Sequence, residues 1–271
     1  MEKAKLDCIL LSKLNYALCV NRVPVLRALT LRSTADAVLR NLTLTVSSSP
    51  EFLLEAKLHI DSLMPGGTLD ASALKLSPSP SFLFSLTESV EGIVRFTLTD
   101  EAGEVLCALE RPLTLLTRDE WPGSAAAPEL LAAFVTPNHP VVADICRKAS
   151  ALLQNWTGSP SFSGYQSGSP NAVRLQLAAV FSAIRAQRIA YCAPPSSFEE
   201  TGQRIRLCDT ILTSGFATCL DFALLAASCL EFAGLHPLVT VFRGHAALGV
   251  WLTEDSFAQS VQDDEIGRAH V

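Results

Sequence analysis

The chain has 271 residues, a net charge of −6, and 49% hydrophobic against 18% charged residues. This length suffices for one large domain or two ordinary ones, and the composition favours a packed core over disorder. The acidic balance offers no phosphate-binding surface, so we expect no direct nucleic-acid contact by this segment.

The eight cysteines are irregularly spaced and form no C-x-x-C pair. This pattern indicates free, buried thiols in a reducing compartment rather than a disulfide framework. The first 14 residues hold an apolar stretch that is short and interrupted by Lys13, so they predict neither a signal peptide nor a membrane span. We therefore expect a cytoplasmic protein without membrane contact.

Residues 1–120 are predicted to be all-β. Turn-forming residues at Ser47–Pro50, Pro65–Gly67 and Asp100–Gly103 separate short segments rich in Val, Thr and Leu. The predicted strands are 23–31, 39–46, 52–60, 81–86, 92–99 and 105–115. This number of short strands is typical of an immunoglobulin-like β-sandwich.

After residue 120 the hydrophobic period changes from two to about 3.6 residues, which indicates helices. Residues 121–129 contain Pro, Gly and several Ala, and we expect a linker there. Helices are predicted at 130–134, 140–156 and 171–191, with a polar loop at 158–170. The second part of the chain is therefore predicted to be α+β.

A helix, a strand and a second strand follow in residues 218–252. Thr218 is placed to cap a helix that begins at Cys219 and runs to Phe232, and Gly234 is placed to end it. Residues 238–242 predict a strand, Arg243 and Gly244 a turn, and His245 opens a second strand over 246–252.

This order of elements is typical of a cysteine nucleophile, Cys219, with a histidine base, His245. A thiol at a helix N-terminus faces unpaired N–H groups and the positive end of the helix dipole, which favours the thiolate. A histidine across from it can act as base and later protonate a leaving amine. We predict Cys219 as nucleophile and His245 as its base; Cys208 is a weaker candidate and Cys229 a core thiol.

A zinc site is the alternative for these residue types. It would be drawn from Cys208, Cys219, His236 and His245, but their spacing matches no structural zinc pattern. We expect no metal and no cofactor.

The same segments resemble a known family. Gly215 to Ala226 (GFATCLDFALLA) resembles the G-x-C-x-D-x-A-x-L core of transglutaminase-like domains, although Gly215 lies one position further from the cysteine than in the tightest form. Gly244 to Trp251 (GHAALGVW) is similar to the histidine strand of that family. The resemblance implies a papain-like α+β domain over 130–265 that acts on a protein or peptide through a thioester, as a peptidase, amidase or transglutaminase.

A narrower resemblance concerns Tyr191 to Arg206 and the blocks around Cys219 and His245. They are similar to the N-terminal region of large bacterial helicase-linked proteins. This implies a fragment of a bacterial protein in which helicase and nuclease modules follow. The alternative function is then a catalytically inactive, protein-binding or regulatory module.

The family also has an acid that orients the histidine, on a strand after it. Asp255, Asp263 and Asp264 are the candidates, but no such strand is predicted. Residues 266–271 (IGRAHV) resemble the translation of a sequencing adapter, so we expect a non-native tail and a domain truncated near residue 265. The oxyanion of the intermediate would accept hydrogen bonds from the N–H of Cys219 and from one side chain. The candidates for that side chain are Gln166, Gln187 and Gln203, and the sequence does not choose among them.

Overall fold

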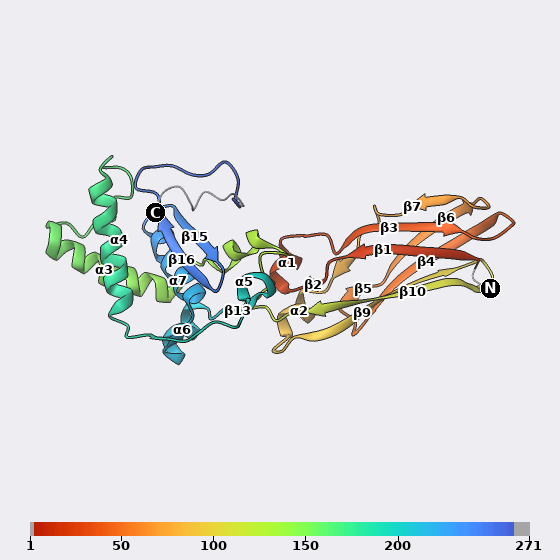
Figure 1. The fold of residues 1–271 in the computed structure, drawn as a ribbon, viewed down its shortest axis with the longest axis horizontal. Helices are drawn as coiled ribbons and strands as arrows, with labels where there is room; N and C mark the ends of the chain where they lie inside the picture. Colours follow the sequence, from red (N-terminus) through yellow and green to blue (C-terminus); the bar gives the residue numbers. More distant parts are fainter. Residues whose placement is uncertain (1–2, 263–271) are drawn as a thin grey trace. The chain divides into compact units, whose positions relative to one another are not determined.

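The computed structural model describes residues 3–262, a mixed chain of helices and strands (Figure 1). It divides into two compact units, Met1–Glu120 and Trp121–Val271. They are called here the N-terminal unit and the C-terminal unit, and each is described by itself.

Two larger sheets and the small pair β5–β8 build the N-terminal unit. The three-stranded sheet has the order β1-β3-β7, and the five-stranded sheet has the order β2-β10-β9-β4-β6. The strands are β1 (Ala4–Leu10), β2 (Lys13–Leu14), β3 (Leu26–Ser33), β4 (Leu39–Ser49), β5 (Leu53–Leu54), β6 (Ala56–Leu63), β7 (Thr68–Asp70), β8 (Ser77–Pro78), β9 (Val90–Thr99) and β10 (Val105–Leu115). The pairs β1–β3, β4–β6, β4–β9 and β9–β10 are antiparallel, whereas β2 runs parallel to β10.

Alternation of buried and exposed residues explains why these segments are strands. Leu42, Leu44 and Val46 of β4 are fully buried while the residues between them are less so. Phe96 of β9 lies opposite Val46 and is also fully buried. One face of each strand thus enters the core, as a period of two requires.

The predicted strand at 81–86 is wrong. Pro80–Ser85 forms the short helix α2, because Ser79 caps it by accepting a hydrogen bond from the Phe82 N–H at 3.3 Å and Pro80 fits its first turn. The predicted strand at 52–60 is interrupted and becomes β5 and β6. Helix α1 (Tyr16–Val20), capped by Asn15, was not predicted.

The C-terminal unit is mainly helical with short strand pairs. Its elements are β11 (Glu120–Trp121), the 3-10 helix η1 (Pro128–Phe134), α3 (Pro140–Thr157), α4 (Pro170–Arg185), β12 (Ala190–Tyr191), α5 (Phe198–Thr201), β13 (Gln203–Arg204), α6 (Cys208–Ser214), β14 (Phe216–Ala217), α7 (Cys219–Phe232), β15 (Pro237–Phe242) and β16 (His245–Val250). The strand pairs are β11–β13, β12–β14 and β15–β16.

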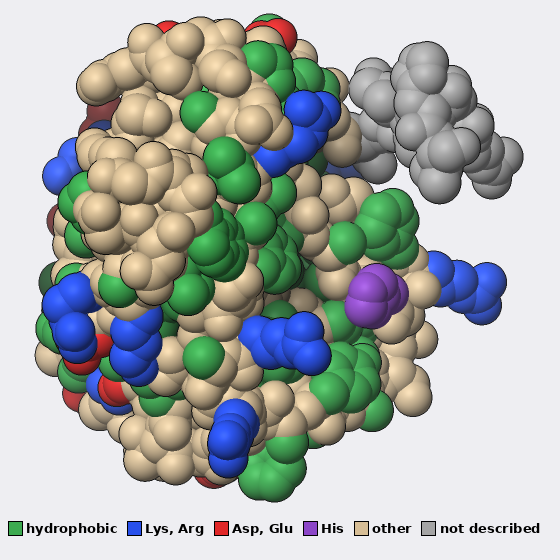
Figure 2. All heavy atoms as spheres, turned by 90° about the vertical axis from the view of Figure 1, so that its left-hand side faces the viewer, with side chains coloured by type: hydrophobic (Ala, Val, Ile, Leu, Met, Phe, Trp, Pro, Cys, Tyr) green, Lys and Arg blue, Asp and Glu red, His purple; other side chains and the backbone are tan. Residues whose placement is uncertain are grey.

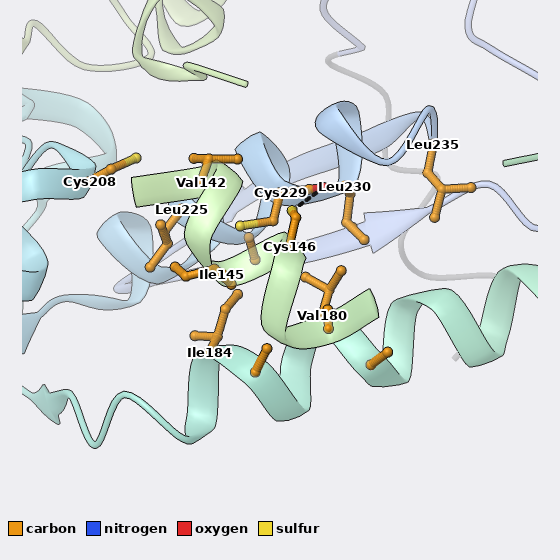
Figure 3. Close-up of a cluster of buried hydrophobic side chains, with 14 of the residues drawn as sticks. Val142, Ile145, Cys146, Val180, Ile184, Cys208, Leu225, Cys229, Leu230 and Leu235 are labelled. Atoms are coloured by element: carbon orange, nitrogen blue, oxygen red, sulfur yellow. Dashed lines mark hydrogen bonds between the residues drawn. The ribbon is translucent and has the colours of Figure 1, made fainter. Parts of the chain in front are cut away.

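Helices α3, α4 and α7 form the core of this unit (Figure 3). Ile145 of α3, Val180 of α4 and Leu225 of α7 are buried in one cluster. The Cys146 thiol donates to the Cys229 carbonyl oxygen at 3.6 Å, which ties α3 to α7. This packing holds α7 against α3 and α4, and the position of its N-terminus is thereby fixed.

The surface of α3 and α4 is partly apolar. Trp156 and Phe181 are exposed over 46% and 45% of their surface. Figure 2 looks at the end of the molecule where these helices lie and shows hydrophobic side chains among Lys and Arg side chains. Between residues 3 and 262 no helix is both long and apolar enough to cross a membrane.

Residues 121–129, predicted as a linker, are partly buried. Trp121 is fully buried, and its indole N–H donates to the Ala127 carbonyl at 3.0 Å. Gly123 and Gly202 have positive φ angles, and a Cβ on Gly202 would meet the Trp121 carbonyl oxygen. Two backbone segments therefore approach closely here, and the small residues that suggested a flexible linker allow this contact.

The predicted helix at 171–191 is too long. Helix α4 ends at Arg185, and Arg188 has a φ of +56°, which a continuing helix cannot contain. Ala190 and Tyr191 then pair as β12 with Phe216 and Ala217 of β14, in parallel. Tyr191 is thus carried by a strand next to the segment that leads into α7.

Candidate functional site

Helix α7 begins with a complete capping box. The Thr218 hydroxyl accepts from the Asp221 N–H at 3.2 Å, and the Asp221 carboxylate accepts from the Thr218 N–H at 2.8 Å. Cys219 is the first residue of the helix and is 5% exposed. Its own N–H is one of the first-turn groups that helix geometry leaves without an intrahelical acceptor. The sequence-based prediction of this helix, from Cys219 to Phe232, is confirmed.

Asp221 is the anchor of this helix start. It is fully buried, and it accepts from the Arg206 backbone N–H at 2.9 Å and from the Arg206 guanidinium at 3.1 Å. The guanidinium balances the buried carboxylate two residues from Cys219. Sequence reasoning missed this role, although the T-x-x-D spacing of Thr218 and Asp221 is a capping-box signal.

Gln203 is the only one of the three candidate glutamines that the structure brings to the Cys219 helix start. Its amide N–H donates to the Thr218 hydroxyl at 3.0 Å. Gln187 instead accepts from Lys148 at 3.0 Å and donates to the Ala183 carbonyl. Gln166 lies in the loop before α4, with its N–H bonded to the Ser163 carbonyl.

Tyr191 is the side chain that approaches the Cys219 thiol. The pKa of Tyr191 is raised by partial loss of solvation, then by the charge of Cys219 and by a hydrogen bond to that thiol; Cys192 adds a smaller effect. The ring itself is 58% exposed. A tyrosine phenol is protonated near neutral pH with or without this shift, so its hydroxyl can donate a hydrogen bond. Sequence reasoning missed it because it extended α4 over this residue.

His245 opens β16, as predicted, directly after the Arg243–Gly244 turn. Its register partner is Phe242 of β15. Strand β16 packs on α7, with Leu248 and Val250 against the core cluster. Histidine and cysteine thus lie on two elements in contact, but no hydrogen bond among residues 3–262 joins the His245 ring to the Cys219 thiol.

Of the predicted third residues, the structure describes Asp255 alone, and the contacts of Asp255 are with His236 and Ser256. The carbonyl oxygen of Asp255 lies 2.8 Å from the His236 ring nitrogen Nδ1, and its carboxylate accepts from the Ser256 N–H. The contact of Asp255 with a histidine is thus made by its backbone carbonyl, and that histidine is His236. Asp263, Asp264 and the predicted tail lie outside the described residues.

The other cysteines have different surroundings. Cys208, the weaker candidate, opens α6 and lies 3.5 Å from the Thr136 hydroxyl. Burial is the largest of the effects that raise its pKa. Cys229 is a fully buried core thiol. Among the residues that the structure describes, no three His, Cys, Asp or Glu side chains gather as metal ligands, so the four residues pooled for a zinc site do not meet.

A cleft of about 510 Å³ lies beside the turn that precedes His245. It is lined by Ser124, Ser197, Glu199, Glu200, Val241, Phe242 and Arg243. The half-exposed ring of Phe242 and the guanidinium of Arg243 belong to the hairpin, whereas the two glutamates belong to α5. The cleft therefore opens next to the end of β16 that carries the histidine.

No protein-family model matches this chain, and no curated protein matches it.

Proposed function

We propose that the C-terminal unit is a transglutaminase-like cysteine acyl-transfer module, preceded by an immunoglobulin-like sandwich in the N-terminal unit. The observation that carries the proposal is the setting of Cys219. It is the first residue of a capped, buried helix, Tyr191 is paired with Ala217 two residues before it, and the strand packed on that helix begins with a histidine. Of the eight cysteines, we propose this role for Cys219 alone.

In the proposed reaction the Cys219 sulfur attacks an amide carbonyl and its proton passes to His245. A carbon–sulfur bond forms, the carbon–nitrogen bond breaks, and His245 gives the proton to the leaving amine. Water or a second amine then attacks the thioester, the carbon–sulfur bond breaks, and the proton returns to the sulfur. The products are those of a peptidase or amidase with water, and of a transglutaminase with an amine.

The oxyanion of the tetrahedral intermediate needs two donors. The backbone N–H of Cys219 is one, and the hydroxyl of Tyr191 is the other in this proposal. Neither donor has to move far, since α7 is fixed by the core and Tyr191 by the β12–β14 pair. A peptide that reaches His245 would pass the cleft at Phe242 and Arg243.

The test is labelling of the whole chain with a chloroacetamide probe, followed by mapping of the modified cysteine. We expect labelling at Cys219 and its loss in His245→Ala. The matched control is His236→Ala, which removes another exposed histidine and should label like the wild type. Equal labelling of Cys219 in the wild type and in His245→Ala would refute the pair.

A second function has one observation in its favour. The Cys219 thiol and the His245 ring share no hydrogen bond in the described part of the chain, and Asp255 is engaged at His236. This supports an inactive protein-binding or regulatory module, in the setting of a bacterial helicase–nuclease protein. Under this alternative, none of the cysteines would be acylated faster than free cysteine at the same pH.

A further inference from the structure

Gln203 is a buried amide whose oxygen has no hydrogen-bond partner among the described residues. The residue is 3% exposed, and its Nε2 donates to the Thr218 hydroxyl at 3.0 Å. Its Oε1 is buried and has no hydrogen-bond partner among the described residues. A buried acceptor without a partner destabilises a fold.

Packing alone does not account for this choice of residue. A methionine has nearly the same shape and would fill the space without an unpaired oxygen. Within residues 3–262 the contact that needs an amide is the bond to Thr218, so the reason for the glutamine lies in what Thr218 does.

Thr218 connects this bond to the nucleophile. The lone pairs of its hydroxyl are both engaged, one by Gln203 and one by the Asp221 N–H. Its carbonyl oxygen accepts from the Phe222 N–H at 3.0 Å. The peptide group between Thr218 and Cys219 contains that carbonyl and also the N–H of Cys219, which is the oxyanion donor in the function proposed above.

Gln203 is itself held rigidly. It opens β13, which pairs with β11, and it follows Gly202, whose backbone lies against Trp121 and Pro122. The buried Trp121 segment therefore anchors Gln203. The amide of Gln203 links this segment to the start of α7 through its hydrogen bond to Thr218.

We propose that Gln203 is a positioning residue that orients the Thr218–Cys219 peptide group, and with it the oxyanion-binding N–H of Cys219. The inference rests on the proposed acyl transfer. Gln203 touches no reacting atom and moves no proton. Its loss leaves the thiol and the base in place and loosens only one donor of the oxyanion site.

Two reagents separate this role from a structural one. Acylation by p-nitrophenyl acetate passes through a tetrahedral oxyanion, whereas alkylation by iodoacetamide does not. In the full chain, Gln203→Met should slow acylation of Cys219 by about tenfold or more, since small misplacements of catalytic groups are costly. Alkylation and the urea midpoint of tryptophan fluorescence should stay at the wild-type values, or the midpoint should rise.

Gln203→Asn is a second variant, whose amide remains polar but is one methylene too short to reach Thr218. It should also slow acylation of Cys219 and leave alkylation unchanged. Gln187→Met is the matched control, and all its values should stay as in the wild type. Unchanged acylation in Gln203→Met would overturn the inference, as would a parallel fall of acylation, alkylation and the urea midpoint. If the ester does not acylate wild-type Cys219 at all, the proposed function itself fails.

Discussion

Asp221 shows at the residue scale how a buried charge is used at this site. Its two oxygens accept from Thr218 and from two groups of Arg206, and none of its surface is exposed. A carboxylate in the first turn also interacts favourably with the helix dipole. The same residue therefore stabilises α7 and fixes the peptide that precedes Cys219.

We expect Asp221→Asn to lower the free energy of unfolding of the C-terminal unit by about 2 kcal/mol, because the new amide N–H₂ faces donors. All three tryptophans, Trp121, Trp156 and Trp251, lie in this unit, so urea denaturation followed by tryptophan fluorescence reports on it. Glu231→Gln makes the same charge change at an exposed position of α7 and should leave the midpoint nearly unchanged. Equal effects of the two substitutions would contradict this role of Asp221.

Tyr191 carries a second prediction. Tyr191→Phe keeps the ring and removes only the hydroxyl, so acylation of Cys219 by p-nitrophenyl acetate should fall by about a hundredfold, the usual effect of losing one oxyanion donor. Alkylation by iodoacetamide should change little. Tyr165→Phe is the control, because it removes the hydroxyl that donates to the Trp251 carbonyl and should leave acylation intact. An acylation rate in Tyr191→Phe equal to that of the wild type would exclude the phenol as a donor.

At the element scale, α7 and the β15–β16 hairpin could be predicted from the sequence, whereas the contacts of the segment before α7 could not. The cap at Thr218, the left-handed Gly234 and the Arg243–Gly244 turn are local sequence signals. The helix start, the helix end and the hairpin turn are found at these residues. The bonds from Gln203 and Arg206 to the start of α7 join residues 15 positions apart and leave no periodic pattern. The position of Tyr191 could not be predicted for a similar reason, since its pairing with Ala217 is a tertiary contact.

The close backbone contact at Gly202 gives a prediction at this scale. Its φ is +87°, and a Cβ would meet the Trp121 carbonyl oxygen and lie 2.8 Å from the Gly123 nitrogen. Gly202→Ala should destabilise the C-terminal unit by about 3 kcal/mol or more, because backbone atoms cannot give way easily.

Gly215→Ala is the matched control for Gly202→Ala. It also has a positive φ, +72°, but a Cβ there would meet no atom within 4 Å. Its cost should be about 1 kcal/mol, from the left-handed conformation alone. Similar urea midpoints for the two variants, again from tryptophan fluorescence, would show that the contact with Trp121 is unimportant.

At the scale of the whole molecule, the chain consists of two units that each have their own buried residues. Composition predicted packed domains, and the change of period near residue 120 indicated a change from strands to helices. The buried state of Trp121 could not be predicted, because Pro, Gly and Ala are equally typical of a linker and of a tight backbone contact.

Leu44 tests whether the units are stable independently. It is fully buried in β4, and Leu44→Ala should destabilise the N-terminal unit by about 2–5 kcal/mol. Hydrogen–deuterium exchange should then accelerate in peptides from β4 and β9 and stay unchanged in peptides from α3 and α7. Faster exchange in both units would show that their stabilities are coupled.

The most direct test of the central claim compares Cys219 with Cys208 in the wild-type chain. Each is the first residue of a helix, and they are 5% and 4% exposed, so position and burial are matched. Of the two, Cys219 is the one that lies two residues after the strand paired with Tyr191 and that has a histidine strand packed on its helix. With a limiting amount of the chloroacetamide probe, peptide mapping should find the label at Cys219 and little at Cys208. Equal labelling of the two thiols, or a preference for Cys208, would contradict Cys219 as the nucleophile.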